Sequence, residues 1–286
     1  MNKTKISIII PFYTATRGIL GKAVLSVLAQ TIRDIEVLVI DDNSPVDANE
    51  ELKDISDIRI KIIKLDTNKG GGLARTIGIS NAIGEYISFL DYDDIWYPYK
   101  LERQLNFFEE INDDKVVLYS KCKIIESRRS FVRPGRAKSN DETVGEYLFC
   151  NNGLIQTSGI FLKRDMLDKV KFHALKRHQD YQFCLSLEKN GAKFFLGKEV
   201  LYEFIQIPKL NDYNFSLKWL DEYSSYLNQR AIKGFKRNVI VRSMIKHGHY
   251  IRAIRYSYKE KLLISCLGIF CKISIKRSLT MLGLLR

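Results

Sequence analysis

The first 90 residues alternate between short apolar runs and stretches with helical spacing. The runs have strand length and are rich in Ile and Val, whereas the intervening stretches place apolar residues three or four positions apart. The expected strands are residues 5–13, 35–42, 58–65 and 85–90, and the expected helices are 17–30, 47–54 and 73–83. Nearly all-apolar strands separated by helices form parallel sheets that are covered on both faces. The sequence therefore predicts an α/β fold.

Distinctive short stretches follow three of these four strands. "PFY" (11–13) ends the first strand, "DDNS" (41–44) follows the second and "DYDD" (91–94) follows the fourth. Ligands of parallel sheets bind beyond the carboxyl ends of the strands. We therefore expect the functional site to form where these three stretches meet.

Three carboxylates crowd into the last of these stretches, as Asp91, Asp93 and Asp94. Helix capping explains them poorly, because Pro98 suits the first position of the next helix and makes Tyr97 its cap. Like charges on a tight turn repel one another unless a cation neutralises them, and short carboxylates suit Mg²⁺ or Mn²⁺. We predict a metal site there, serving a ligand that carries phosphate.

The glycine-rich stretch "NKGGGLARTIG" (68–78) does not match a known phosphate-binding loop. It lacks the G-K-[ST] of a P-loop, and Arg75 stands where a dinucleotide fingerprint needs its third glycine. Two interpretations stay open: a flexible turn before a helix, or an anion site formed by a helix N-terminus and Arg75. The acidic motif also lacks the Thr that an aspartyl-phosphate phosphatase needs, whereas nucleotidyl transfer is compatible with the residue types.

The basic charge is confined to the C-terminal end. Residues 228–286 contain 14 Lys or Arg and one acid, Glu260, while residues 1–227 carry 32 basic and 32 acidic residues. Apolar and basic residues interleave in this tail, which is typical of an interfacial helix on an anionic membrane leaflet; an ordinary helical subdomain with a basic face is the alternative. The tail contains no recognised nucleic-acid motif, so we expect no nucleic-acid partner.

Several features predict a cytoplasmic protein. The five cysteines are scattered, which argues against a disulfide framework or a zinc site. The N-terminal apolar run ends at Pro11 with no cleavage site after it, so we expect a strand there and no signal peptide. The longest uncharged run of the tail, residues 262–271, is half the length of a membrane span.

These blocks together resemble the family 2 glycosyltransferases with the GT-A fold. The resemblance rests on "ISIIIPFY", "AVLSVLAQT", "EVLVIDDNS", the continuous stretch 68–105 and, later, "HQDYQF". It implies a mixed, mainly parallel sheet flanked by helices, a D-x-D metal site and inversion at the anomeric carbon. It also implies a nucleotide-sugar-binding half (1–110) and an acceptor and catalytic-base half (111–227), followed by the basic, helical, membrane-associating tail (228–286).

The resemblance assigns roles to individual residues. Tyr13 and Asp42 would hold the nucleotide base, with Asp42 accepting a hydrogen bond from an imide N–H. Asp91 and Asp93 match the D-x-D pair, and Asp93 and Asp94 are the expected contacts to ribose and metal. The full set expected to bind the nucleotide sugar is Pro11, Tyr13, Asp42, Arg75, Asp91 and Asp93, with Asp93 and Asp94 as metal ligands.

Asp180 is the candidate catalytic base, because the family places its carboxylate just ahead of a helix and inversion needs a group that takes the acceptor's proton. A helix cap is the alternative role for Asp180, and His178 is an alternative base. The chain departs from the family at Gln179, where an acid commonly precedes the base, and at Thr14 and Thr76, where Asn is usual.

Two further segments carry weaker predictions. Residues 127–143 are polar and rich in Arg, without strong periodicity, so we expect a long loop that either closes over the donor or is simply solvated. Thr157 and Ser158 stand where they would meet an acceptor.

The predicted function is inverting transfer of a hexose or N-acetylhexosamine from a nucleoside diphosphate sugar, with a UDP-sugar preferred. The acceptor is a lipid-linked saccharide in O-antigen, capsule or other surface-polysaccharide synthesis, at the inner face of the plasma membrane. A metal-dependent nucleotidyltransferase and a non-catalytic membrane-bound scaffold are the alternatives.

Overall fold

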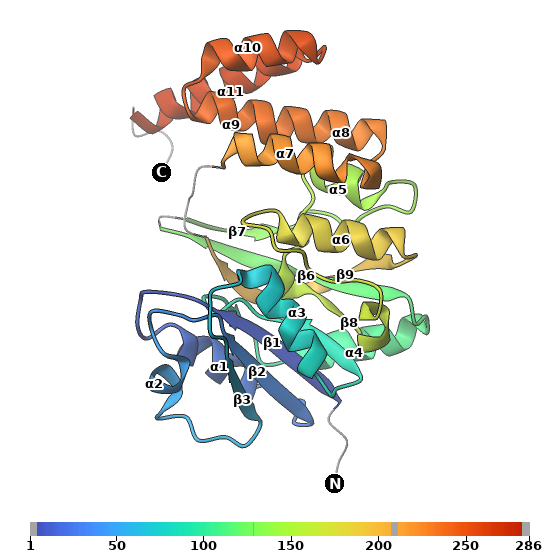
Figure 1. The fold of residues 1–286 in the computed structure, drawn as a ribbon. Helices are drawn as coiled ribbons and strands as arrows, with labels where there is room; N and C mark the ends of the chain where they lie inside the picture. The colour runs from blue at the N-terminus through green and yellow to red at the C-terminus, as the bar shows by residue number, and fades with distance from the viewer. Residues whose placement is uncertain (1–4, 128, 207–210, 282–286) are drawn as a thin grey trace. The chain divides into compact units, whose positions relative to one another are not determined.

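The computed structural model describes residues 5–127, 129–206 and 211–281 (Figure 1). Backbone contacts divide the chain into two compact units. The first comprises Met1–Ile125, Phe131–Lys138 and Leu154–Gln206, and the second comprises Glu126–Ser130, Ser139–Gly153 and Ile207–Arg286. The second unit is therefore larger than the basic segment 228–286, because it also includes residues that precede this segment.

The described residues form a mixed, nine-stranded sheet in the order β3-β2-β1-β4-β8-β6-β9-β5, with β7 paired to β6. Strands β3, β2, β1 and β4 run parallel to one another, as do β6 and β9, whereas β8 and β5 are antiparallel to their neighbours. The strands are β1 Ile6–Phe12, β2 Ile35–Asp41, β3 Ile60–Lys64, β4 Tyr86–Phe89, β5 Ile95–Trp96, β6 Val116–Glu126, β7 Arg129–Arg133, β8 Phe161–Lys163 and β9 Lys193–Ile205. All four predicted strands and the predicted sheet class are confirmed.

Helices cover both faces of the parallel half of the sheet, and the three predicted ones are confirmed. In the first unit they are α1 Leu20–Leu28, α2 Ala48–Leu52, α3 Gly71–Asn81, α4 Lys100–Ile111 and α6 Gln179–Lys189, with short 3₁₀ turns η1 Thr157–Gly159 and η2 Arg164–Leu167. In the second unit they are α5 Val144–Phe149, α7 Tyr213–Tyr223, α8 Gln229–Phe235, α9 Arg242–Lys246, α10 Tyr250–Lys259 and α11 Leu263–Met281, with a 3₁₀ turn η3 Ser224–Tyr226 and a π-helical segment η4 Lys236–Val241.

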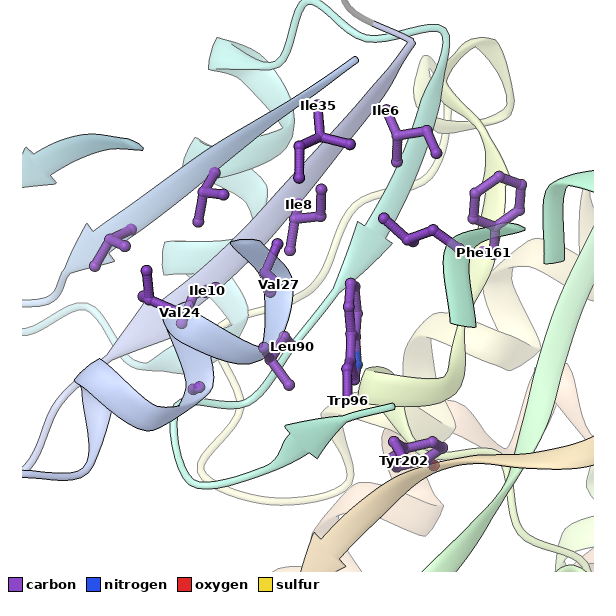
Figure 2. Packing of buried hydrophobic residues seen from close by; sticks show 14 of the residues in the cluster. Ile6, Ile8, Ile10, Val24, Val27, Ile35, Leu90, Trp96, Phe161 and Tyr202 are labelled. Carbon is purple, nitrogen blue, oxygen red and sulfur yellow. The ribbon is translucent and has the colours of Figure 1, made fainter. Parts of the chain in front are cut away.

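Side chains alternate across β1 and so build two cores. Ile6, Ile8 and Ile10 point to one face, where Val24 and Val27 of α1 pack against the sheet (Figure 2). Each such buried aliphatic side chain stabilises the fold by about 1.5–3 kcal/mol. The same cluster continues across the sheet through Ile35, Leu90, Trp96, Phe161 and Tyr202.

The opposite face of β1 packs against α3. Strand β4, which pairs with β1, packs against α6. A methyl group added to Gly78 of α3 would lie 2.4 Å from Ile9 Cγ2, so helix and strand touch backbone to side chain. Phe89 of β4 meets Phe183 of α6 at 5.7 Å between ring centroids, and Phe183 stacks on Phe172 at 3.8 Å. This layer brings the amino ends of α3 and α6 to the carboxyl edge of the sheet.

The predicted start of α4 is wrong by two residues. The helix begins at Lys100 with Tyr99 as its cap, because Tyr97 is already committed elsewhere. The Tyr97 amide donates to Leu201 O of β9, and its carbonyl accepts from the side chain of Gln30, which also accepts from the Leu101 amide. A side chain from the end of α1 therefore sets where the helix begins.

The predicted long loop over residues 127–143 is wrong in part, because the segment contains a strand. Arg129–Arg133 form β7, which pairs with β6 in the sheet. Three of its five side chains are exposed and only Phe131 packs against the core, so backbone pairing with β6 contributes more to this strand than burial of an apolar face.

The second unit is helical and built around an aromatic cluster. Phe235 of α8 lies 4.9 Å from both Phe149 of α5 and Trp219 of α7, measured between ring centroids. Among the described residues, no helix is both long and apolar enough to span a membrane.

Gly78→Ala should destabilise the protein by about 1–3 kcal/mol, because the new methyl group would overlap Ile9 in a closely packed interface. Gly21→Ala in α1 is the matched control: the nearest atoms to its added methyl group lie at 3.6 and 3.7 Å, an ordinary contact. The control should be neutral or more stable by up to about 1 kcal/mol. Thermal unfolding measures both, and an equal loss in the two variants would contradict the packing described here.

Candidate functional site

The three predicted stretches meet at the carboxyl edge of the sheet. The loop after β1 is bonded to the loop after β2, since the Thr14 amide donates to Ser44 Oγ at 2.9 Å and Ser44 Oγ donates to the Thr14 carbonyl at 3.0 Å. Thr14, one of the departures from the family pattern, thus has a structural role in this turn. Tyr13 beside it is exposed, with 48% of its surface accessible.

Pro11 lies inside β1, and its missing N–H opens the sheet at this edge. Pro11 pairs with Ile40 of β2, but β4 pairs with β1 only as far as Ile9, whose carbonyl accepts from the Leu90 amide. The backbone groups of Pro11 and Ile9 point to the same side of β1, which is the side of β4. The Pro11 nitrogen therefore faces a position at which β4 no longer pairs with β1. Strands β1 and β4 therefore diverge at the point where open α/β sheets place their ligands.

Asp42 shapes the glycine-rich loop. Its carboxylate is buried and accepts from the amides of Lys69 and Gly70, both at 2.7 Å. Gly70 has φ +83°, and a methyl group on Gly72 would lie 2.2 Å from the His173 carbonyl oxygen. Two of the three glycines are thus explained by backbone conformation and close approach.

Arg75 and Asp91 form the central ion pair of the site. The Arg75 side chain is 8% exposed and that of Asp91 is 25% exposed. The guanidinium also donates to Gln179 Oε1 at 2.9 Å and lies 5.5 Å from the Phe172 ring centre, while its Nε has no hydrogen-bond partner among the described residues. Arg75 therefore connects α3, the end of β4 and the start of α6.

Asp94 lies beneath this pair, fully buried. One of its oxygens accepts from the Ile205 amide at 3.1 Å, and the other accepts from Ser158 Oγ at 2.6 Å and Gln156 Nε2 at 3.0 Å. Burial, together with the charges of Asp91 and Asp93, raises the pKa of Asp94 well above its usual range. Both oxygens are thus engaged by the protein.

Gln156, Thr157 and Ser158 support the aspartate turn. Gln156 Nε2 also donates to Asp91 at 2.9 Å, Thr157 Oγ1 donates to Asp91 at 3.2 Å, and Ser158 Oγ accepts from the Asp91 amide at 2.9 Å. All three side chains are buried. Thr157 and Ser158 therefore face the aspartates, whereas the sequence predicts that they meet an acceptor. The sequence predictions assigned no role to Gln156. Its one signal in the sequence is that it begins a run of three polar residues, 156–158, that follows two apolar ones.

Asp93 lies between these two aspartates in sequence and is partly buried. Its charge contributes to raising the pKa of Tyr92, after burial. In the part of the chain that the structure describes, no group of three or more His, Cys, Asp or Glu side chains could by itself hold a metal ion. The oxygen donors do fit Mg²⁺ or Mn²⁺ bound in another common way, by one or two carboxylates together with phosphate oxygens and water.

Asp180 lies in the first turn of α6, whose cap is His178 and not Asp180. Burial raises the pKa of Asp180 to about 6; the Tyr181 amide and Arg75 oppose this shift, and Asp91 adds to it. Asp180 follows Gln179, whose side chain bonds Arg75, and its charge interacts with those of Arg75 and Asp91. Gln179, which replaces the usual acid, binds Arg75 through its amide oxygen.

His178 stacks on Tyr181 at 5.1 Å between ring centroids, and its backbone is left-handed, with φ +62°. Burial and the neighbouring Arg177 lower the pKa of His178 to about 4, so the imidazole is neutral at pH 7. Of the two candidate bases, Asp180 has the pKa closer to neutral pH and the electrostatic connection to Asp91.

Comparison with known proteins decides the family. The sequence model described as glycosyl transferase family 2 matches residues 7–171, which include the glycine-rich loop and the three aspartates at 91, 93 and 94 but not Asp180. The chain belongs to glycosyl transferase family 2. The resemblance drawn from the sequence is confirmed, and the protein is a transferase.

Relatives of this glycosyltransferase extend the match into the second unit. The amylovoran biosynthesis glycosyltransferase AmsB of Erwinia amylovora is 31% identical over 254 residues, which cover 82% of this chain and 83% of AmsB. An uncharacterized glycosyltransferase of Haemophilus influenzae is 30% identical over 216 residues, covering 74% of this chain and 82% of its own.

A solved structure with the same fold is S. aureus TarS 1-349 in complex with UDP-GlcNAc. It aligns with a TM-score of 0.64 over 93% of this glycosyltransferase and 80% of TarS 1-349, at 18% identity. This likeness confirms the predicted fold.

Asp180→Asn should make the protein more stable at pH 7.5. The pKa of Asp180 is about 6 in the folded protein against an ordinary 3.8, so folded-state stability is lost as the pH rises from about 4 to about 6. An uncharged Asn avoids this loss, which is on the order of 1–3 kcal/mol.

Thermal unfolding of the two proteins should therefore differ at pH 7.5 and converge near pH 4. Asp47→Asn is a control of opposite sign, because the hydrogen bond from Lys64 lowers the pKa of Asp47 to about 2. A melting temperature for Asp180→Asn that is unchanged across this pH range would contradict the environment described for Asp180.

Proposed function

We propose that this glycosyltransferase transfers a hexose or N-acetylhexosamine, with inversion, from a UDP-sugar to a hydroxyl of a lipid-linked saccharide. The observation that carries the proposal is the Arg75–Asp91 ion pair, which joins the D-x-D turn to the start of α6, where Asp180 lies. A donor site and a base that serve one reaction need this proximity. The UDP-GlcNAc complex of TarS, a protein of the same fold, supports the choice of donor.

In this proposal the nucleotide lies in the opening between β1 and β4. Exposed Tyr13 would stack on the base and Pro11 would line the opening, while Asp42 would accept from an imide N–H with a lone pair left beside its two amide partners. Asp91, held by Arg75, would face the ribose, and the unpartnered Nε of Arg75 supplies one more donor near the phosphates.

We assign the Mg²⁺ or Mn²⁺ contact to Asp93 alone, and not to Asp94. Asp94 is fully buried with both oxygens bonded to the protein, so we propose that it shapes the turn from which Asp93 projects. A divalent cation, when bound, stabilises the negative charge of a nucleoside diphosphate leaving group. The remaining cation ligands in this arrangement are phosphate oxygens and water.

Asp180 is the proposed base. With a pKa of about 6 it is ionised at neutral pH, and it can take the proton of the acceptor hydroxyl. The hydroxyl oxygen forms its bond to the anomeric carbon as the bond from that carbon to the diphosphate oxygen breaks. The nucleoside diphosphate then leaves on the opposite face, which inverts the anomeric configuration.

A lipid-linked acceptor in surface-polysaccharide synthesis is supported by AmsB, a relative named for amylovoran biosynthesis. The basic tail supports an anionic membrane surface as a second partner, and we propose that the enzyme acts at the cytoplasmic face of the plasma membrane. All five cysteines lie in the described part of the chain and are unpaired, which fits a reducing compartment.

Product analysis tests this function against its two alternatives. With a UDP-sugar labelled in the sugar and in the β-phosphate, glycosyl transfer should yield labelled UDP and a labelled acceptor. A nucleotidyltransferase would instead transfer UMP and release a sugar phosphate that carries both labels, and a scaffold would leave the donor intact. Either of these outcomes with a lipid-linked acceptor present would overturn the proposal.

Asp93→Asn should weaken Mn²⁺ binding in the presence of UDP by at least about a hundredfold, because a carboxylate ligand contributes several kcal/mol. Asp94→Asn is the matched variant one residue away. It should keep the Mn²⁺ affinity within about threefold but lower the melting temperature, since a buried amide disturbs the contacts with Ser158 and Gln156 by about 1–3 kcal/mol.

Calorimetric titration of Mn²⁺ into each UDP-saturated variant measures the affinities, and thermal unfolding measures the stabilities. If Asp94→Asn folds normally and loses Mn²⁺ binding while Asp93→Asn keeps it, the two roles are reversed.

A further inference from the structure

Exposed apolar side chains concentrate on the last two described helices. The described residues include 16 large apolar side chains that are exposed, and nine of them lie on α10 and α11, between Tyr250 and Ile275. Scattered single residues of this kind are normal on a protein surface, whereas a contiguous group marks an interaction site.

The exposed residues follow helical spacing on each helix. Ile251, Ile254 and Tyr258 of α10 are 70%, 50% and 74% exposed and form one stripe, while Ala253 and Ser257 on the other side are buried. On α11, Ile264, Leu267 and Ile275 are exposed at 88%, 60% and 59%, opposite buried Cys266. Each helix therefore buries one side and presents an apolar stripe on another.

The two helices form one surface. The Tyr250 ring of α10 meets the Phe270 ring of α11 edge to face at 5.4 Å between centroids, and the Leu262 amide between the helices donates to the Ser257 carbonyl at 2.7 Å. Figure 1 shows α10 and α11 running beside each other at the end of the second unit. The apolar stripes thus lie on neighbouring helices of the same packed pair.

The charges on these helices are basic and exposed. Arg255 and Lys259 of α10, Lys261 in the connection and Lys272 of α11 are all exposed. The one acid of the pair, Glu260, accepts an ion pair from Lys236 Nζ at 2.5 Å, so its charge is already balanced. The surface therefore combines apolar stripes with exposed positive charge.

This combination favours an anionic bilayer over a second copy of the chain. A symmetric dimer through the same face would bring the basic residues of two copies together, which like-charge repulsion opposes. The headgroup region of an anionic leaflet offers negative charge to the Lys and Arg residues and an apolar layer directly below it to the Ile and Leu residues. Tyr250 and Tyr258 are amphipathic rings of the kind that settle at this boundary.

We propose that α10 and α11 form a membrane-docking face that lies flat in the interface of an anionic bilayer and inserts Ile254, Tyr258, Ile264 and Leu267. The proposal makes the membrane partner of the proposed function specific, yet it rests on the second unit alone. Neither helix spans the bilayer, and the docked face works by partial insertion together with charge attraction.

Vesicle co-sedimentation of the full chain tests the proposal without any sugar donor. Binding to vesicles of phosphatidylglycerol and phosphatidylethanolamine should exceed binding to phosphatidylcholine by at least about tenfold at low salt. Ile254→Gln with Ile264→Gln should weaken binding by at least about tenfold through lost insertion. Arg255→Gln with Lys259→Gln should weaken it by about thirtyfold on anionic vesicles and hardly at all on phosphatidylcholine.

The matched control is Ile58→Gln with Ile83→Gln in the first unit, two isoleucines that are 98% and 54% exposed. This variant should bind vesicles like the parent protein. Tyr258→Trp should report insertion by a blue shift of its emission on anionic vesicles, whereas Tyr99→Trp, at a position 56% exposed in the first unit, should show no shift.

Equal weakening by the control pair, or no vesicle binding by the parent, would overturn the proposal. Sedimentation velocity without lipid provides a further check: a dimer that is lost only in Ile254→Gln with Ile264→Gln would assign the face to a second copy instead. Vesicle binding that persists while sugar transfer is absent would refute the proposed function and leave the docking face standing.

Discussion

The candidate site depends on the ion pair between Arg75 and Asp91. A guanidinium that is 8% exposed is costly to bury without a partner, and Asp91 provides the compensating charge. The same guanidinium holds Gln179 of α6 and stacks over Phe172, so one side chain fixes three elements that are distant in sequence. Because Gln179 is neutral, the ion-pair partner of Arg75 is Asp91 of the D-x-D turn.

That pairing also explains how three aspartates coexist on four residues. Asp91 is paired with Arg75, and burial together with the charges of Asp91 and Asp93 disfavours the charged form of Asp94. In the proposed function Asp93 is the carboxylate that would contact a cation, and one carboxylate suffices for a cation shared with a diphosphate. The ion pair of Asp91 and the burial of Asp94 thus give these two carboxylates different environments, which reduces the repulsion expected from the sequence.

In the proposed function, the two units would separate the chemistry from membrane attachment. The first holds the sheet, the aspartate turn and Asp180, and the second holds the aromatic helical core and the exposed stripes of α10 and α11. A contiguous apolar surface on the first unit would invite aggregation, whereas the helical pair α10 and α11 gathers nine exposed apolar side chains on a surface that lipid could cover. A division of this kind suits an enzyme whose acceptor is anchored in a membrane.

The sequence by itself determined the parallel half of the sheet, its covering helices and the location of the site, because strand and helix periodicity and the residues after each strand are local properties. It also predicted roles for Asp91 and Arg75 from contiguous motifs, and the structure joins these two side chains in an ion pair. Tertiary structure alone decided that Asp94 is buried, because its partners Gln156, Ser158 and Ile205 are 62, 64 and 111 residues away. The start of α4, set by the Gln30 side chain, and strand β7, made by pairing with β6, likewise depend on contacts that no local pattern encodes.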